Sequence, residues 1–369
     1  MGRGKGRKYR KRNGAQGGEK LTPSEPSSTI KEKRPGDVSD LPIITVDATA
    51  APLRSYCLTG TAAVGLDSRI YRIGGLCSSS RDVYILEKGY RSSGCTAACK
   101  GRCHAEVFCV EVDGQGQPNN NNEWKRCAPM NIGRKDPLAC AVDGKIYVFG
   151  GAPLGDFGPF IGEVYDPVED KWDKLPPLAD FEGYSPISPM NVVLDDPKDA
   201  TNKLILVHIQ GTQPLYAFNV RRKIWECFDD KFGWVGPDKD FRSSPAYRMS
   251  PTNAVVDNFL YCFSAYRKVF AYDLNGKEWH HLNGQEWHPI HAILKKESES
   301  DVFLFHLGGN TLCFLWSYGI FCGQFPDVSA DVIIGCAKFK VDGKSSQSLR
   351  LGYFRHKVPD YGPVHYVQL

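Results

Sequence analysis

The sequence lacks the marks of several protein classes. It contains no Asn-x-Ser/Thr glycosylation acceptor, and its Gly- and Arg-rich N-terminus has no apolar segment, so we expect no secretory signal. Gly-x-Ser-x-Gly, a phosphate-cradling glycine loop and His-Glu-x-x-His are also absent. Without a signature of hydrolases, nucleotide-binding proteins or zinc proteases, we expect a protein that is not an enzyme and uses no cofactor.

Long apolar stretches are scarce as well. Only residues 302–325 are apolar enough to suggest a membrane helix, and they contain His306, the turn-like Gly308-Gly309-Asn310 and many β-branched or aromatic residues. This pattern predicts two buried strands around a turn, and we expect no membrane partner.

Cysteine is plentiful but carries no disulfide pattern. The 13 cysteines are odd in number and scattered from Cys57 to Cys336. Together with the missing signal, this indicates reduced thiols in the nucleus and/or the cytoplasm.

Charge is unevenly distributed along the chain. Residues 1–40 hold eleven Lys or Arg against five Asp or Glu, a net +6, whereas the whole chain carries +4, so the remainder carries −2. We therefore predict a basic disordered tail over residues 1–40 and a folded domain over residues 41–369 that is not a basic nucleic-acid domain.

The tail contains a run of six basic side chains: Lys5, Arg7, Lys8, Arg10, Lys11 and Arg12. Such a run attracts phosphates or is recognised by nuclear import receptors. Three alternatives stay open: a nuclear or nucleolar address, contact with RNA or ribosomes, or a solvated tail without a function.

The folded part contains an internal repeat: an apolar strand that ends in Gly-Gly, a second strand with an aromatic residue and Asp, and then a Trp strand. The clearest copy covers residues 145–178, an earlier copy starts at residue 69, and two weaker copies start at residues 203 and 259. Trp124, Trp172, Trp225 and Trp279 follow one another at intervals of 48, 53 and 54 residues. A period of about 50 is typical of kelch blades.

Each conserved position of the repeat has a structural reason. Glycines at the strand end allow positive φ and close approach of chains, and the Trp is a flat filler whose polar tip finds a partner between blades. A fifth copy begins at residue 301, and residues 331–341 and 348–358 are strand-like. With Leu41–Asp47 as a closing strand we expect six blades, with five and seven as neighbouring alternatives.

The two best copies, IYVFGG…VYDP…KW and IYRIGG…VFCVEVD…EW, resemble the kelch-repeat family over roughly residues 55–340, and more particularly plant kelch proteins fused to an F-box. The resemblance implies an all-β kelch-type β-propeller that acts as a non-catalytic protein–protein interaction module, an adaptor or a substrate-recognition scaffold. Leu41-Pro42 could begin an F-box, but residues 46–52 lack a leucine-rich helical pattern, so we expect none here.

A long insertion is predicted over residues 76–104 in the first blade. It contains the weak zinc candidates Cys95, Cys99, Cys103 and His104. Three evenly spaced thiols with the fourth ligand adjacent to the third strain a tetrahedral site, so the spacing favours a mobile interaction loop with reduced thiols.

Aromatic and Arg side chains in two loops are the candidates for partner binding: Tyr90, Arg91, Phe157 and Phe160. A histidine group, His280, His281, His288 and His291, does not predict a metal site, because consecutive strand residues point to opposite faces. The alternative function is a propeller enzyme, or a protein that binds a metal or small molecule in the axial funnel.

Overall fold

The computed structural model describes residues 58–77, 103–113, 124–151, 161–179, 192–209, 214–232, 253–263, 269–281, 302–322, 329–341 and 346–358, which belong to one compact unit, Pro42–Leu369. These residues form strands and turns without a helix, so the predicted all-β class is confirmed. In this described part, accordingly, no helix is long and apolar enough to cross a membrane. The basic tail, the closing strand Leu41–Asp47 and most of the insertion lie outside it.

The first two four-stranded sheets come from the clearest repeats. The first sheet has the order β2-β3-β5-β6 and the second the order β7-β8-β9-β10, all antiparallel. Their bounds are β2 Ala62–Leu66, β3 Arg69–Ile73, β5 Val107–Glu111, β6 Lys125–Cys127, β7 Leu138–Val142, β8 Lys145–Phe149, β9 Gly162–Asp166 and β10 Lys171–Lys174. A two-residue pair, β1 (Leu58–Thr59) with β4 (Leu76–Cys77), accompanies the first sheet.

The third and fourth sheets repeat this topology, with the orders β11-β12-β13-β14 and β15-β16-β17-β18. Their bounds are β11 Val192–Asp196, β12 Asp199–His208, β13 Leu215–Asn219, β14 Ile224–Asp229, β15 Ala254–Val256, β16 Phe259–Phe263, β17 Val269–Asp273 and β18 Glu278–His281. The weaker sequence copies therefore form the same unit as the strong ones.

The fifth sheet has the order β19-β20-β21-β22 and much longer strands. Its bounds are β19 Val302–His306, β20 Thr311–Cys322, β21 Ser329–Val341 and β22 Ser346–Val358. The predicted pair of strands around the Gly308-Gly309 turn is confirmed by β19 and β20.

The described residues thus form a kelch-type β-propeller with five four-stranded sheets. The sequence predicts six blades, with five as one of the two alternatives. The difference arises at the end of the chain. The strands near residues 331–341 and 348–358, which the sequence suggested for an incomplete last blade, instead pair with β20 and complete the fifth sheet.

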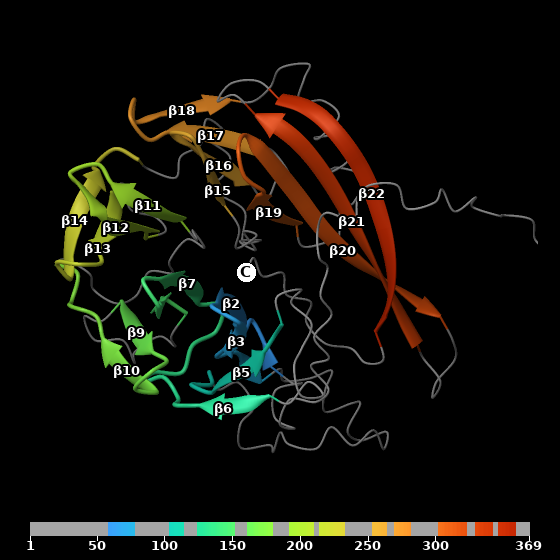
Figure 1. Cartoon of the computed structure of the whole chain (residues 1–369), viewed down its shortest axis with the longest axis horizontal. Helices are drawn as coiled ribbons and strands as arrows, with labels where there is room; N and C mark the ends of the chain where they lie inside the picture. The colour runs from blue at the N-terminus through green and yellow to red at the C-terminus, as the bar shows by residue number, and fades with distance from the viewer. Residues whose placement is uncertain are drawn as a thin grey trace, which may run out of the picture. The chain divides into compact units, whose positions relative to one another are not determined.

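The sheets follow one another in chain order around a common centre, with first strands inside and last strands outside (Figure 1). Alternation along β8 shows how each strand serves two interfaces. Ile146 and Val148 belong to the core shared with the first sheet, whereas Tyr147 and Phe149 belong to the core shared with the third. The period-two placement of side chains therefore produces a separate core between successive sheets.

Tryptophan indoles bridge successive sheets with hydrogen bonds. Trp172 Nε1 donates to the Ala128 carbonyl at 2.8 Å, Trp225 Nε1 to Pro176 at 2.9 Å, and Trp279 Nε1 to Phe232 at 3.0 Å. Each acceptor lies within three residues after the last strand of the preceding sheet. The predicted role of the Trp polar tip is confirmed, and it recurs at three joints.

A loop at residues 131–136 ties both diglycines of the first two sheets together. A Cβ at Gly74 would come within 2.5 Å of the Arg134 carbonyl, and one at Gly151 within 2.4 Å of the Lys135 carbonyl. Both glycines also have positive φ, 67° and 74°. The two predicted reasons for glycine, positive φ and close approach, therefore apply at both positions.

The same loop contains a buried ion pair. Arg134 and Glu163 are both fully buried, and Arg134 Nη2 lies 3.0 Å from Glu163 Oε1. The Glu163 carboxylate also accepts hydrogen bonds from the backbone N–H groups of Asn131 and Ile132, while Arg134 Nη1 donates to the Gly150 carbonyl. Burial lowers the pKa of Arg134, and the adjacent carboxylate opposes this shift. Both charges are therefore paired and hydrogen-bonded, as buried charges must be.

Candidate functional site

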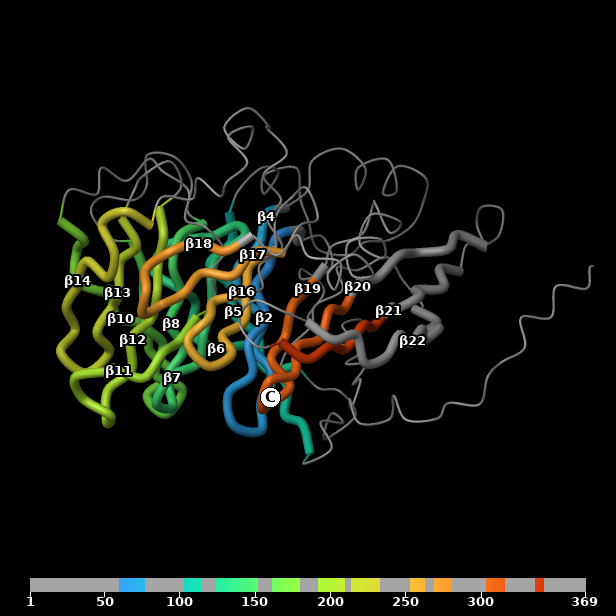
Figure 2. Tube along the Cα trace, turned by 90° about the horizontal axis from the view of Figure 1, so that it is seen from above, coloured from blue at the N-terminus to red at the C-terminus, as the bar shows by residue number. Residues whose placement is uncertain are grey.

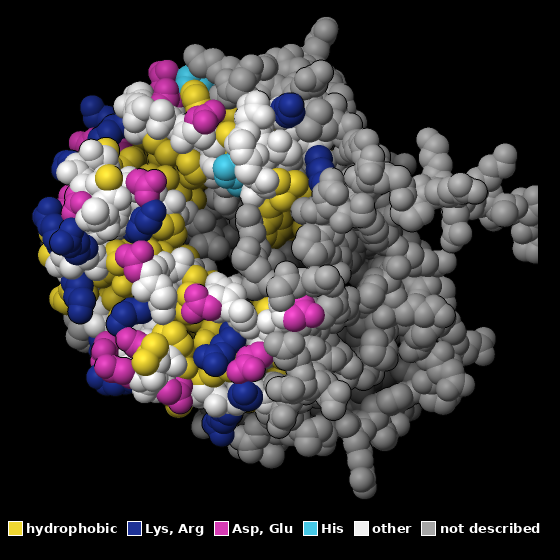
Figure 3. All heavy atoms as spheres, in the orientation of Figure 1, with side chains coloured by type: hydrophobic (Ala, Val, Ile, Leu, Met, Phe, Trp, Pro, Cys, Tyr) yellow, Lys and Arg dark blue, Asp and Glu magenta, His cyan; other side chains and the backbone are white. Residues whose placement is uncertain are grey.

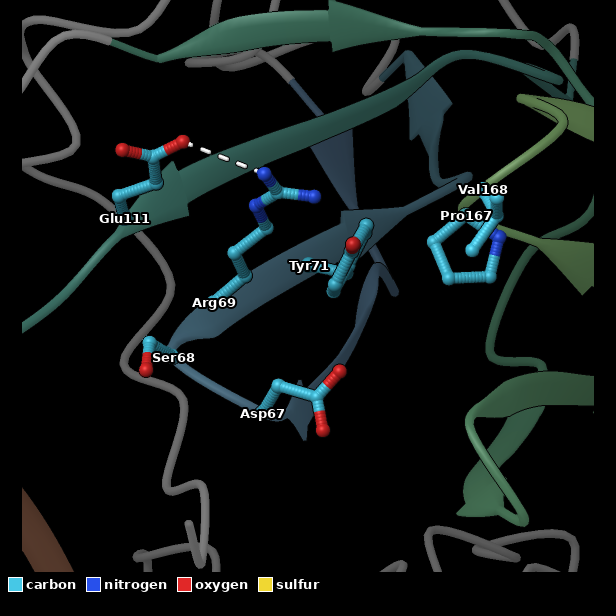
Figure 4. Close-up of a pocket in the computed structure, with 7 residues that line it drawn as sticks. All are labelled: Asp67, Ser68, Arg69, Tyr71, Glu111, Pro167 and Val168. Atoms are coloured by element: carbon cyan, nitrogen blue, oxygen red, sulfur yellow. Dashed lines mark hydrogen bonds and ion pairs between the residues drawn. The ribbon is translucent and has the colours of Figure 1, made fainter.

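A pocket of about 440 Å³ lies between the first and second sheets. Its lining comprises Asp67, Ser68, Arg69, Tyr71, Glu111, Pro167 and Val168. Figure 4 shows Arg69 and Glu111 on one side and Pro167 with Val168 on the other, with Tyr71 between them. The pocket therefore has a charged wall from the first sheet and an apolar wall from the second.

The β2–β3 turn places Asp67 at the pocket. Asp67 has φ 53°, and the Ser68 carbonyl accepts a hydrogen bond from Val112 N at 2.8 Å. Asp143 and Asp257, in the first-to-second-strand turns of the second and fourth sheets, have φ of 50° and 52°. Asp is one of the few residues that tolerates this left-handed conformation, so the turns share one design. In Figure 2 the β2–β3 turn, drawn in blue, lies at the lower edge of the molecule.

The charged wall is internally neutralised. Glu111 Oε1 lies 3.3 Å from Arg69 Nη2 and 3.1 Å from Lys125 Nζ. The hydrogen bond from Lys125 lowers the pKa of Glu111, and a hydrogen bond to Tyr71 raises the pKa of Arg69. Burial raises the pKa of Tyr71, so its hydroxyl stays protonated at neutral pH. Arg69 and Glu111 therefore satisfy each other before any ligand arrives.

The apolar wall is held rigidly at the surface. Val168 is 93% exposed, the largest exposure among the large hydrophobic side chains that the structure describes. Asp166 Oδ1 accepts from the backbone N–H groups of Val168 at 2.9 Å and Glu169 at 3.3 Å, and Lys145 Nζ lies 2.6 Å from Asp166 Oδ2. The Lys145 hydrogen bond and the two backbone bonds lower the pKa of Asp166. The β9–β10 turn thus presents Val168 in a fixed position.

The same turn is anchored to the first sheet. Asp170 Oδ1 accepts hydrogen bonds from Ala128 N and from the Tyr165 hydroxyl, both at 2.7 Å. These bonds lower the pKa of Asp170. Because Trp172 bonds the Ala128 carbonyl as well, the two walls of the pocket are held in a fixed relation.

Next to the charged wall lies a pair of thiols. Cys109 pairs with Tyr71 across β5 and β3, and Cys127 lies on the adjacent β6. The hydrogen bond from Cys127, helped by Arg69 and Lys125, lowers the pKa of Cys109 to about 7. Cys109 is buried and is not part of the pocket lining.

The arrangement is suited to binding. The seven lining residues include neither histidine nor cysteine, and they offer an apolar edge and charged groups, with the buried Tyr71 ring behind them. No group of three His, Cys, Asp or Glu within the described ranges could hold a metal ion. Over the part of the face in Figure 3 that is coloured by side-chain type, Lys and Arg side chains lie among Asp and Glu side chains along the outer edge.

Of the zinc candidates, the structure describes only Cys103 and His104. Cys103 forms an isolated bridge with Leu76, and the His104 backbone N donates to the Gly75 carbonyl at 2.8 Å. His104 Nδ1 lies 3.8 Å from Glu106 Oε2. Cys95 and Cys99 lie outside the described residues, so this set stays a prediction.

The other predicted site residues are mostly outside the described part. These are Tyr90, Arg91, Phe157, Phe160, His288, His291 and the basic run of the tail. His280 and His281 are consecutive residues of β18, and His280 lies beside the Phe259 ring at 5.9 Å. The predicted strand position of this histidine pair is confirmed.

The pocket itself was missed at the level of sequence. One signal existed: Leu66-Asp67-Ser68, Val142-Asp143-Gly144 and Val256-Asp257-Asn258 recur before the second strand of a blade. That signal locates the turn of Asp67 but not Val168, which lies about one hundred residues further along the chain and comes from a different blade.

Comparison with known proteins agrees with this fold. A Kelch motif matches residues 133–179, the stretch that contains the Arg134–Glu163 pair and Trp172. F-box/kelch-repeat protein At4g19330 of Arabidopsis thaliana is 24% identical over 178 residues, which cover 46% of this chain and 39% of the relative. Putative F-box/kelch-repeat protein At4g11770 of the same plant is 25% identical over 231 residues, covering 62% and 44%. Kelch-like protein terF of Aspergillus terreus is 33% identical over 116 residues, covering 29% and 25%.

The fold and the pocket define a class, a β-propeller with a pocket between two blades. The motif match over residues 133–179 and the similarity to F-box/kelch-repeat proteins support a kelch-repeat family. The matched part of the first two relatives is less than half of their length, 39% and 44%.

Proposed function

We propose that this protein is a non-catalytic protein–protein interaction module that serves as an adaptor or substrate-recognition scaffold. The observation that carries the proposal is the fixed pocket between the first two sheets, where rigid turns hold exposed Val168 beside a charged wall. A rigid surface binds a partner without the cost of ordering its own side chains.

The similarity to F-box/kelch-repeat proteins supports this role. The match covers less than half of the length of those relatives, so the adaptor role is carried to this chain only as a proposal. For the tail we propose a nuclear address at Lys5–Arg12, which places the protein in the nucleus and/or the cytoplasm, with RNA contact as the alternative for the same run.

The proposal is tested by affinity capture with the full chain, a chain without residues 1–40, and a full chain with Tyr90→Ala and Phe157→Ala, followed by mass spectrometry. We expect the first two to retain the same few proteins, because the propeller is the binding module. The third variant asks whether the predicted loops contribute. Capture that consists of nucleic acid and disappears with the tail would contradict the proposal.

A further inference from the structure

One charged residue of the pocket lining, Asp67, is not part of the ion pairs within the pocket. Arg69 and Glu111 are paired with each other, and Glu111 also with Lys125. The exposed carboxylate of Asp67 has no ion-pair partner among the residues that the structure describes, and neither has that of Glu169, next to Val168. The charged residues that line the pocket are Asp67, Arg69 and Glu111, so the lining carries a net charge of −1, and Asp67 is the lining carboxylate without an ion-pair partner among the described residues.

The opposite wall of the pocket is suited to apolar contact. Pro167 and the exposed Val168 form an apolar edge that the Asp166 bonds hold in place, and the Tyr71 ring lies between this edge and Arg69. A wholly apolar ligand would leave the Asp67 carboxylate desolvated without a partner, which is costly. An acidic ligand would have to compete with Glu111 for Arg69.

A side chain with an apolar stem and a cationic end can pack against the apolar edge and also pair with the Asp67 carboxylate. We propose that this pocket seats a lysine or arginine side chain of a partner protein, with the stem against Pro167 and Val168 and the cationic end at Asp67. Long basic side chains bind in this way because their methylene groups pack while the charged end stays near water. The inference rests on the proposed interaction function and names the chemistry of the partner.

The direct test uses small probes and the methyl groups of Val168 as reporters. Full-length protein is titrated, with methyl NMR detection, with N-acetyl-arginine methylamide, N-acetyl-lysine methylamide, N-acetyl-norleucine methylamide and N-acetyl-glutamate methylamide. We expect saturable shifts of the Val168 methyl signals with the arginine and lysine probes, weaker at higher salt. Equal binding of norleucine, or preferential binding of glutamate, would overturn the proposal.

Matched variants test the assigned carboxylate. Asp67→Asn keeps a residue that tolerates positive φ and removes the charge, so we expect the arginine probe to bind about threefold to tenfold more weakly. Asp143→Asn makes the same change in the equivalent turn of the second sheet, outside the pocket, and should leave binding unchanged. Equal effects of the two variants would refute a specific seat at Asp67.

A second set of measurements separates the seat from the general function. Capture by the wild-type chain, by Asp67→Asn combined with Val168→Ser, and by Asp143→Asn is compared for each retained protein. Loss only in the double variant supports the seat. Retention of partners by the double variant overturns the seat and leaves the interaction function intact, whereas failure of the wild type to retain any protein contradicts the function itself. Tighter probe binding after removal of residues 1–40 would assign the seat to the chain's own basic run and overturn the partner assignment.

Discussion

The second and fifth sheets share a four-stranded antiparallel topology but are fixed to their neighbours differently. In the second sheet, the buried Glu163 carboxylate gathers Arg134 and the 131–136 loop, and Trp172 bonds the first sheet. In the fifth sheet, Leu312, Phe314 and Phe339 pack against Tyr261 of the fourth sheet in an apolar core, and β22 contains no tryptophan. Both blades pack through apolar cores, and the second adds directed polar contacts at its joint with the first.

The two sheets also differ in strand length. The second sheet has strands of four or five residues. The fifth sheet combines a five-residue β19 with strands of 12 and 13 residues.

The largest expected effect comes from Glu163→Gln. The substitution keeps the shape but leaves the buried Arg134 charge without a counter-ion, and we expect the free energy of unfolding to fall by about 3–5 kcal/mol. Urea denaturation measures the change. Glu169→Gln, in the exposed β9–β10 turn, is the matched control and should alter stability by less than about 0.5 kcal/mol. A loss as small as that of the control would contradict the polar anchoring of this sheet.

Trp172→Phe tests the bridge to the first sheet. It retains an aromatic ring against Tyr165 but leaves the Ala128 carbonyl without its indole donor. We expect a loss of about 1–3 kcal/mol by denaturant unfolding. Ile224→Val, a small change on the partly exposed strand β14, serves as the control, and an equal effect of both would argue against the bridge.

Phe314→Leu tests the apolar packing between the fourth and fifth sheets. Phe314 stacks on Phe339 with ring centroids 5.0 Å apart, and a similar-sized apolar side chain can repack there. We expect a loss below about 1.5 kcal/mol, smaller than that of Glu163→Gln although both changes nearly conserve volume. A larger loss for Phe314→Leu than for Glu163→Gln would reverse the comparison.

The smallest expected effect is a pH dependence at Asp170. Hydrogen bonds from Ala128 N and Tyr165 hold its folded pKa below the unfolded value, so its contribution is present above about pH 4 and is lost as pH falls through the folded pKa. Because the side chain is largely exposed, we expect on the order of a few tenths of a kcal/mol. Stability of the wild type and Asp170→Asn, followed from pH 6 downward, should converge in acid; a constant difference would contradict the assignment.

Features that repeat along the chain could be predicted from the sequence. The diglycines and the tryptophans mark the strands of the early blades, and the structure confirms both their positions and their contacts. The last strands carry neither marker, so only their pairing with β20 decides which blade they complete.

Features that depend on distant pairs could not be predicted. Arg134 and Glu163 are charged, and a composition rule places charged residues at the surface, yet they lie in the core because each neutralises the other. The pocket requires Asp67 and Val168 from different blades to meet. No local sequence pattern indicates that two residues of different blades lie side by side.

The indole bridges also give the propeller a direction of assembly. In each case the donor follows its acceptor along the chain, by 44, 49 and 47 residues. At synthesis rates of about 5–20 residues per second, a carbonyl leaves the ribosome roughly 2–10 s before the tryptophan that binds it. At these three joints the acceptor carbonyl is therefore synthesised before its donor, an order that suits docking of the later blade onto the earlier one.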